Sequence, residues 1–178
     1  NGQIIAQGSQ HIVCMDSKTL RPTSLAEGFI DNFRLDDPRI FTFDRFPKIT
    51  PPENSFVTQR EVEWQDLDAQ NHVNNAIYVG YAEEAALQEL KASGWSLTKL
   101  AEQNLAFFPR RIHIQYLSPA VWGERLNIST HSLNLHQSGG SRYAGITRDD
   151  GSQVAECIMD WVLTNKETGE EQSLPAEL

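Results

Sequence analysis

The chain has 178 residues, of which 39% are hydrophobic and 22% are charged, and its formal net charge is −9. This composition is typical of a globular protein with one domain, or one domain and an extension. The negative charge argues against nucleic acid or an anionic membrane surface as the main partner. No apolar run approaches the roughly 20 residues of a membrane span. The chain starts without a basic signal-peptide segment, and its two cysteines form no C-x-x-C pair, so we expect a cytoplasmic protein without disulfides.

The two ends of the chain resemble each other. Residues 2–25 align without a gap with residues 151–174, and six aligned pairs are identical, among them Val13/Val162 and Leu25/Leu174. In the C-terminal copy, two strands over 142–148 and 153–164 flank a turn at 149–151, which predicts a hairpin. The repeat predicts that the tail of one domain precedes a whole second domain. An added N-terminal edge strand is the alternative interpretation.

The segments between the repeats follow in chain order. We expect a short helix over 25–35 and an extended, proline-rich linker over 36–54. Alternating residues predict a strand over 56–64, and a polar loop follows over 66–75. An apolar helix over 76–92 ends at Ser93-Gly94, and a second short helix covers 96–102. Strands are expected over 107–117 and 124–135, with a turn at 138–141. One long helix followed by antiparallel strands predicts an α+β fold in which a curved sheet wraps the helix.

The polar loop before the long helix concentrates side chains that support acid–base chemistry. A carboxylate acts as general base or nucleophile, and an imidazole relays a proton near neutral pH. The helix start presents backbone N–H groups that stabilise an oxyanion. The loop is therefore suited to acyl transfer. Turn formation and helix capping explain Asp66 and Asn74 at least as well, but explain Asp68 and His72 less well.

These residues also form a family motif. Asp66-Leu67-Asp68, His72-Val73-Asn74-Asn75 and Tyr78 match the pattern D-x-D-x-x-x-H-V-N-N-x-x-Y. The pattern resembles the signature of hotdog-fold thioesterases, which include the 4-hydroxybenzoyl-CoA thioesterase-like enzymes and the acyl-ACP thioesterases. The resemblance covers residues from about 56 to the end. It implies a hotdog thioesterase domain over 55–178, a linker over 30–54, and the closing strand of a partial hotdog repeat over 1–29.

The resemblance also implies an activity and a catalytic set. The expected reaction is hydrolysis of an acyl-CoA or acyl-ACP thioester in fatty-acid metabolism, without a metal or cofactor. Asp68 matches the catalytic carboxylate, and His72 matches the catalytic histidine of the acyl-ACP branch. That branch has an asparagine where this chain has Gln70, so Gln70 or the following Asn71 is expected to orient water or the carboxylate. Hotdog sheets pair in dimers, so we expect a homodimer or pairing with a preceding hotdog repeat.

The substrate is expected to contact the start of the long helix. Backbone N–H groups around Asn75 and Ala76 are the candidate oxyanion donors, and Tyr78 and Tyr81 are candidates for the acyl site. Two strand aromatics, Phe107 and Phe108, are further candidates for an acyl tunnel. An anionic carrier would need a local basic patch, for which the candidates are Arg110, Arg111, Arg125 and Arg142.

Two other functions stay open. A hotdog hydratase or dehydratase acts on the same thioesters, but its usual D-x-N-x-x-H or G-H-F-P motif does not occur in this chain. A non-catalytic acyl-thioester binding domain is favoured by residues 117–119, where the acyl-ACP branch carries a further acid and this chain has none. The chain also has no G-x-S-x-G or H-E-x-x-H motif, so neither a serine hydrolase nor a zinc hydrolase is expected.

Overall fold

The computed structural model describes residues 8, 13–16, 18–19, 21–29 and 45–176. The chain divides into two units, residues 1–45 and 46–178, and their boundary falls within the predicted linker. In the first unit, a bridge between Met15 and Pro22 closes a turn in which Asp16 Oδ1 accepts a 2.7 Å hydrogen bond from Thr19 N. Most of the predicted N-terminal closing strand and of the predicted helix over 25–35 lies outside the described residues, so the partial repeat stays a prediction.

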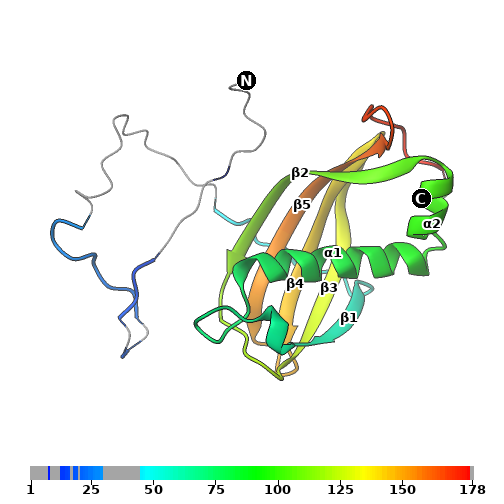
Figure 1. Cartoon of the computed structure of the whole chain (residues 1–178). Helices are drawn as coiled ribbons and strands as arrows, with labels where there is room; N and C mark the ends of the chain where they lie inside the picture. Colours follow the sequence, from blue (N-terminus) through cyan, green and yellow to red (C-terminus); the bar gives the residue numbers. More distant parts are fainter. Residues whose placement is uncertain (1–7, 9–12, 17, 20, 30–44, 177–178) are drawn as a thin grey trace. The chain divides into compact units, whose positions relative to one another are not determined.

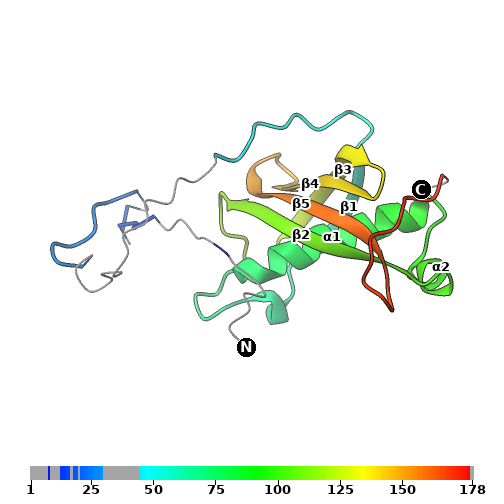
Figure 2. The ribbon, with the colours of Figure 1, turned by 90° about the horizontal axis from the view of Figure 1, so that it is seen from above.

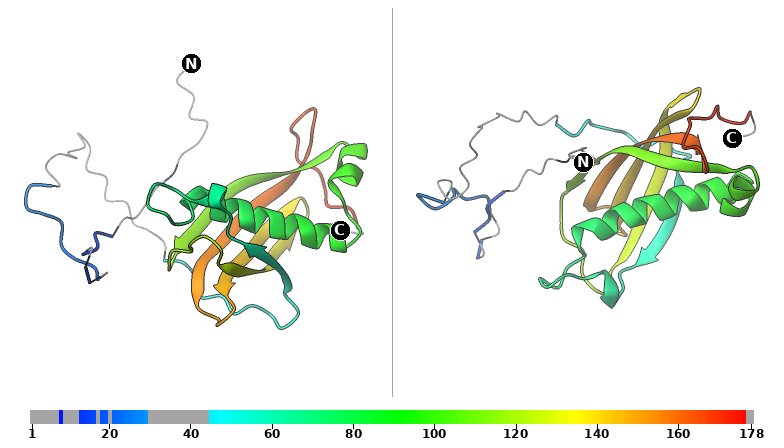
Figure 3. Two further views of the ribbon diagram at one scale, coloured as in Figure 1. Left: turned by 60° about the horizontal axis from the view of Figure 1, so that its bottom comes forward. Right: turned by 45° about the horizontal axis from the view of Figure 1, so that its top comes forward.

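The second unit is a curved antiparallel sheet with one long helix across its face (Figures 1 and 2). The strand order is β1-β3-β4-β5-β2, and the two views of Figure 3 show the sheet curving around the helix. The elements are β1 (Phe56–Glu61), η2 (Trp64–Asp66), α1 (Asn75–Ala92), α2 (Leu97–Glu102), β2 (Leu105–Tyr116), β3 (Arg125–His136), β4 (Gly139–Arg148) and β5 (Gln153–Asn165). The predicted α+β architecture is confirmed.

The long helix begins and ends where the sequence indicates. The Asn74 side chain accepts a 3.0 Å hydrogen bond from Ala76 N, which caps the first turn. Gly94 follows the last turn with a φ of 90°, a conformation that favours glycine. The face toward the sheet buries Tyr78, Tyr81 and two alanines, and their burial fixes α1 on the core. None of the helices formed by the described residues is long and apolar enough to span a membrane.

Two boundaries differ most from those expected. The first strand ends at Glu61 because Val62 exchanges backbone hydrogen bonds with Gly123 and Glu124, and a single 3-10 turn then begins at Trp64. The β3–β4 turn lies at 137–138, before the predicted position, and Gly139 and Gly140 belong to β4. A Cβ on Gly140 would clash with the backbone oxygen of Asn134, so glycine serves close strand packing here.

Candidate active site

The polar loop folds into a tight turn between η2 and α1. Leu67 and Val73 form a bridge that closes its base. Inside it, Asp68 N donates to His72 O at 2.9 Å, and Asn71 N donates to Asp68 O at 3.1 Å. Asn71 has a φ of 61°, a left-handed conformation that asparagine tolerates well. The turn therefore holds the alternate side chains of Asp68, Gln70 and His72 close together.

These three side chains form a connected polar cluster. The backbone N–H of Gln70 donates to Asp68 Oδ1 at 2.8 Å, and His72 Nδ1 lies 3.5 Å from Asp68 Oδ2. On the other side of the imidazole ring, Nε2 lies 2.9 Å from Gln70 Oε1. The side chains of Asp68 and His72 are 28% and 30% exposed, so water reaches them. Of the two amides expected to assist, Gln70 contacts the histidine, and Asn71 shapes the turn.

The start of α1 lies directly after this cluster. The N–H of Ala76 is bound by the Asn74 side chain, and the N–H of Ile77 donates to Asn74 O at 2.9 Å. Among the described residues, these bonds leave the N–H of Asn75 without an acceptor in the first turn. The carbonyl of Asn75 accepts a 2.9 Å hydrogen bond from the Tyr116 hydroxyl. Asn75, rather than Ala76, therefore has the open backbone donor at the start of α1.

The first carboxylate of the motif has different surroundings from the second. Asp66 is buried, and its Oδ2 accepts hydrogen bonds from Tyr81 Oη at 2.6 Å and from Glu63 N at 2.9 Å. Arg60 Nη2 lies 3.6 Å from Asp66 Oδ1, and its guanidinium lies over the Tyr81 ring. Burial, reinforced by Asp66, raises the pKa of Tyr81 far above its ordinary value. Asp66 and Tyr81 thus hold the loop against the helix.

Tyr78 anchors a second loop to the same part of α1. Its hydroxyl accepts a 3.1 Å hydrogen bond from Ala120 N, and Ala120 O accepts one from Val73 N. Burial raises the pKa of Tyr78 above its ordinary value, so the phenol keeps its proton. The hydroxyls of the two tyrosines expected at the acyl site, Tyr78 and Tyr81, are therefore bound within the protein.

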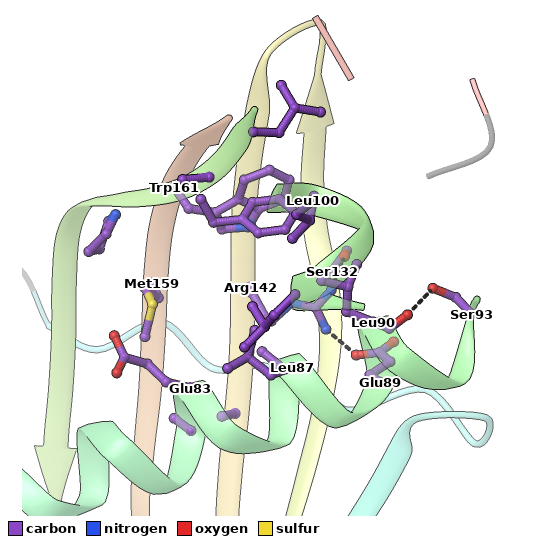
Figure 4. Close-up of a pocket in the computed structure, with 18 of the residues that line it drawn as sticks. Glu83, Leu87, Glu89, Leu90, Ser93, Leu100, Ser132, Arg142, Met159 and Trp161 are labelled. Carbon is purple, nitrogen blue, oxygen red and sulfur yellow. Dashed lines mark hydrogen bonds and ion pairs between the residues drawn. The ribbon is translucent and has the colours of Figure 1, made fainter. Parts of the chain in front are cut away.

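A cavity of about 680 Å³ lies between α1 and the sheet, farther along the helix (Figure 4). Phe107 lines it as expected, whereas Phe108 is 52% exposed and does not. The cavity walls are mostly apolar and come from α1, α2 and strands β2 to β5; they include Ala82, Ala86, Leu87, Leu90, Leu97, Leu100, Leu105, Pro109, Leu135, Met159 and Trp161. Its volume is that of a typical small-ligand pocket, which measures roughly 300–1,000 Å³.

Five titratable cavity residues lie outside the site predicted from the motif. Glu83 and Glu89 enter from α1, and Arg142 enters from β4 (Figure 4). Cys157 of β5 and Lys166, which follows β5, also line the cavity. Arg142, expected to serve an anionic carrier, instead forms an ion pair with Glu89. Burial raises the pKa of the Cys157 thiol to about 12, which makes this thiol a poor nucleophile at neutral pH. Among the described residues, no three His, Cys, Asp or Glu side chains gather as metal ligands would.

A helical pattern in the sequence marks one wall of this cavity. Glu83, Ala86, Leu87 and Leu90 recur at the spacing of one helix face, and all four line the cavity. The pairing of Arg142 with Glu89 joins residues 53 positions apart. Only the tertiary fold, which no local pattern in the sequence reveals, brings that pair together.

Comparison with known proteins shows the family. The sequence profile of the thioesterase-like superfamily matches residues 62–178. The long-chain acyl-CoA thioesterase FadM of Escherichia coli K12 is 33% identical over 122 residues, which cover 68% of this chain and 92% of FadM. The crystal structure of YbaW, a probable thioesterase from Escherichia coli, is 32% identical, with a TM-score of 0.60 over 69% of this chain and 92% of that one.

Two more distant structures share the fold. A Staphylococcus aureus protein in complex with CoA is 17% identical, with a TM-score of 0.66 over 73% of this chain and 82% of that one. A 1,4-dihydroxy-2-naphthoyl-CoA thioesterase from Synechocystis is 18% identical, with a TM-score of 0.65 over 69% of this chain and 91% of that one. At these identities the likeness concerns the fold alone. The chain therefore belongs to the thioesterase-like superfamily and has the hotdog fold that its motif implied.

Proposed function

We propose that this protein hydrolyses long-chain acyl-CoA thioesters. The observation that carries the proposal is the cluster of Asp68, Gln70 and His72 beside the open backbone N–H of Asn75. The apolar cavity under α1 offers space for an acyl chain. CoA is the proposed carrier because the curated relative FadM is an acyl-CoA thioesterase. Acyl-ACP is the alternative carrier.

In the proposed reaction, Asp68 supplies the base. Its Oδ1 is held by the Gln70 backbone and its Oδ2 lies toward His72, so the carboxylate is fixed before substrate arrives. Asp68 takes a proton from water, and the water oxygen attacks the thioester carbonyl. The resulting oxyanion accepts a hydrogen bond from Asn75 N–H. When the C–S bond breaks, the leaving thiolate takes the proton that Asp68 removed from water, giving a fatty acid and CoA thiol and restoring the Asp68 carboxylate. Direct attack by Asp68, followed by hydrolysis of the anhydride, uses the same geometry.

The proposed activity is tested by release of free thiol from acyl thioesters. The wild-type protein is incubated with acyl-CoA of increasing chain length and with matched acyl-ACP, and a thiol reagent follows the product. We expect turnover that rises with chain length and is faster for CoA than for ACP. Binding without any thiol release would contradict the proposal and support a non-catalytic binding domain. Loss of the conjugated absorbance of an enoyl-CoA, without thiol release, would instead indicate a hydratase.

We also propose that β2 pairs with β2 of a second copy. β1 and β2 form the two edges of the sheet built by the described residues. β2 has 12 residues and exposes Phe108, Ile112 and Tyr116, whereas β1 has six and exposes Val57. A long edge strand with exposed apolar side chains is a template for pairing. This arrangement is the homodimer expected from the family resemblance.

The dimer is tested by mass in solution. Ile112→Lys places a charge on the proposed interface and should shift the mass from dimer to monomer in light scattering after size-exclusion chromatography. Val57→Lys, on the opposite edge strand, is the matched control and should leave the dimer intact. A wild-type monomer would contradict the homodimer and favour pairing with a preceding hotdog repeat.

A further inference from the structure

A charged pair stands inside the mostly apolar cavity. Arg142 enters from β4 and Glu89 from α1, and Figure 4 shows them facing each other. Arg142 Nη1 donates to Glu89 Oε2 and, at 3.3 Å, to Thr130 Oγ1. Its Nη2 donates to Ser132 Oγ at 3.2 Å. The two charged side chains are only 19% and 30% exposed, so the pair presents a fixed polar spot to whatever fills the cavity.

Helix attachment alone does not account for this pair. Arg142 and Glu89 are partly withdrawn from water, and the desolvation cost of such a pair can exceed the gain from the attraction between its two charges. At the preceding helix position, Gln88 Oε1 accepts a 2.8 Å hydrogen bond from Thr58 Oγ1, which joins α1 to β1 without any charge. Leu87 and Leu90 beside the pair line the same cavity with apolar surface. A charged pair at this place therefore suggests recognition of a polar group on the ligand.

The pair and its neighbour retain capacity for further hydrogen bonds. A guanidinium has five N–H groups, and a hydroxyl both donates and accepts. The hydrogen bonds formed among the described residues engage Nη1 and Nη2 of Arg142, one carboxylate oxygen of Glu89, and Ser132 Oγ as an acceptor. Arg142 Nε–H and one Nη2–H, the Ser132 hydroxyl proton and the second Glu89 oxygen thus remain for a ligand. Because the pair has no net charge, it suits a neutral oxygen better than a carboxylate, which Glu89 would repel.

We propose that the cavity binds acyl chains bearing an uncharged oxygen substituent, a hydroxyl or a ketone, which Arg142, Glu89 and Ser132 recognise. Glu89 lies 14 residues after Asn75, about 21 Å along the helix axis. A thioester held at the start of the same helix would place the recognised oxygen far along a long chain. The proposal rests on the proposed function for the thioester end, but binding of the chain itself does not require hydrolysis.

The proposal is tested by binding without turnover. Free fatty acids of equal length displace a fluorescent fatty-acid probe from the full-length protein: one unsubstituted, one series with a hydroxyl at successive distal carbons, and one dicarboxylic acid. We expect the best hydroxy acid to bind about fivefold to tenfold more tightly than the unsubstituted acid, the effect of one hydrogen bond. The dicarboxylic acid should bind more weakly than either. Equal binding of the hydroxy and unsubstituted acids at every position would overturn the proposal.

Variants identify the residues responsible. The double variant Arg142→Met/Glu89→Met removes both charges together and should lose the preference for the hydroxy acid while still binding the unsubstituted acid. Thr58→Val/Gln88→Leu removes the neutral helix–sheet link outside the cavity and should keep the preference. Ser132→Ala, a smaller change for use if the double variant does not fold, should reduce the preference about twofold to threefold. Retention of the full preference in a folded double variant, or in Ser132→Ala where the double variant does not fold, would contradict the proposal.

Hydrolysis is measured on the same proteins, so the two proposals can fail separately. A protein that prefers the hydroxy acid but releases no thiol from acyl-CoA would support this inference and contradict the proposed function. A protein that hydrolyses acyl-CoA but binds the hydroxy and unsubstituted acids equally would contradict this inference alone.

Discussion

Tyr81 donates a 2.6 Å hydrogen bond from its hydroxyl to Oδ2 of Asp66, joining the helix to the loop that precedes it. The backbone carbonyl of Asp66 also accepts from Asn74 N at 2.9 Å. Asp68, two residues later, keeps its carboxylate at the surface of the same loop. The two carboxylates of the D-x-D motif therefore have different surroundings: Asp66 fixes the loop, and Asp68 is the partly exposed carboxylate that we propose as the base.

Removing either partner of this bond should lower stability. Tyr81→Phe leaves a buried carboxylate oxygen short of one donor, and Asp66→Asn weakens the same bond, so each should cost about 1–3 kcal/mol of unfolding free energy. The double variant should cost less than the sum of the two single variants, because one bond is lost only once. Urea unfolding followed by circular dichroism measures all three. Strict additivity would show that the bond does not couple the loop to the helix.

Asn75→Pro tests the proposed oxyanion donor by removing its N–H. Asn75 is the first residue of α1, a position where proline is well tolerated, and Asn74 before it has the extended backbone that proline requires. We expect an almost unchanged melting temperature and a kcat about a hundredfold to a thousandfold lower. Asn75→Ala, which keeps the N–H, should retain activity. Wild-type kcat in the folded proline variant would exclude this N–H as the donor.

Loss of the contact between His72 and Gln70 should lower kcat less than loss of the Asp68 carboxylate. Nε2 of His72 lies 2.9 Å from Gln70 Oε1, and loss of one such hydrogen bond changes a rate by about tenfold or less. Gln70→Ala should therefore lower kcat modestly, and Gln70→Asn, with a shorter reach, should restore little. Steady-state kinetics of thiol release measures both. A loss as large as that from an Asp68 variant would mean that Gln70 itself contacts the reacting atoms.

Stability should fall in alkaline solution because of Cys157. Burial raises its pKa to about 12, whereas the pKa of a thiol in an unfolded chain is ~8.5. Between these values the unfolded state has lost the proton and the folded state has kept it. The contribution of this thiol to the free energy of unfolding is therefore fully present below about pH 8.5 and decreases as the pH rises to about 12. This one thiol contributes a slope of up to about 1.4 kcal/mol per pH unit.

The slope is obtained from urea unfolding at neutral pH and at several alkaline values. Cys157→Ala should make the alkaline decline shallower, and Cys14→Ser, in the first unit, serves as the control and should not. Burial also raises the pKa of Tyr143, so part of the decline should persist in Cys157→Ala. An alkaline slope identical in the wild type and Cys157→Ala would contradict the assignment to this thiol.

Local patterns in the sequence predict most of the fold and the loop site. The apolar run and the flanking Asn74 and Gly94 place the helix within one residue of its observed start, because capping is a local interaction. The site motif likewise lies within one loop, so Asp68 and His72 are found by reading along the chain. The whole cavity could not be predicted, because its walls come from both helices and from strands β2 to β5. The division of roles between Asp66 and Asp68 depends on Tyr81, which lies 15 residues after Asp66.

The kcat of Asp68→Asn on a long-chain acyl-CoA tests the central claim most directly. Asparagine preserves the size of the side chain but cannot accept a proton or attack the carbonyl, so thiol release should fall about a hundredfold to ten-thousandfold. The partly exposed position of Asp68 predicts a melting temperature close to that of the wild type. A folded Asp68→Asn protein that releases thiol at the wild-type rate would contradict the account.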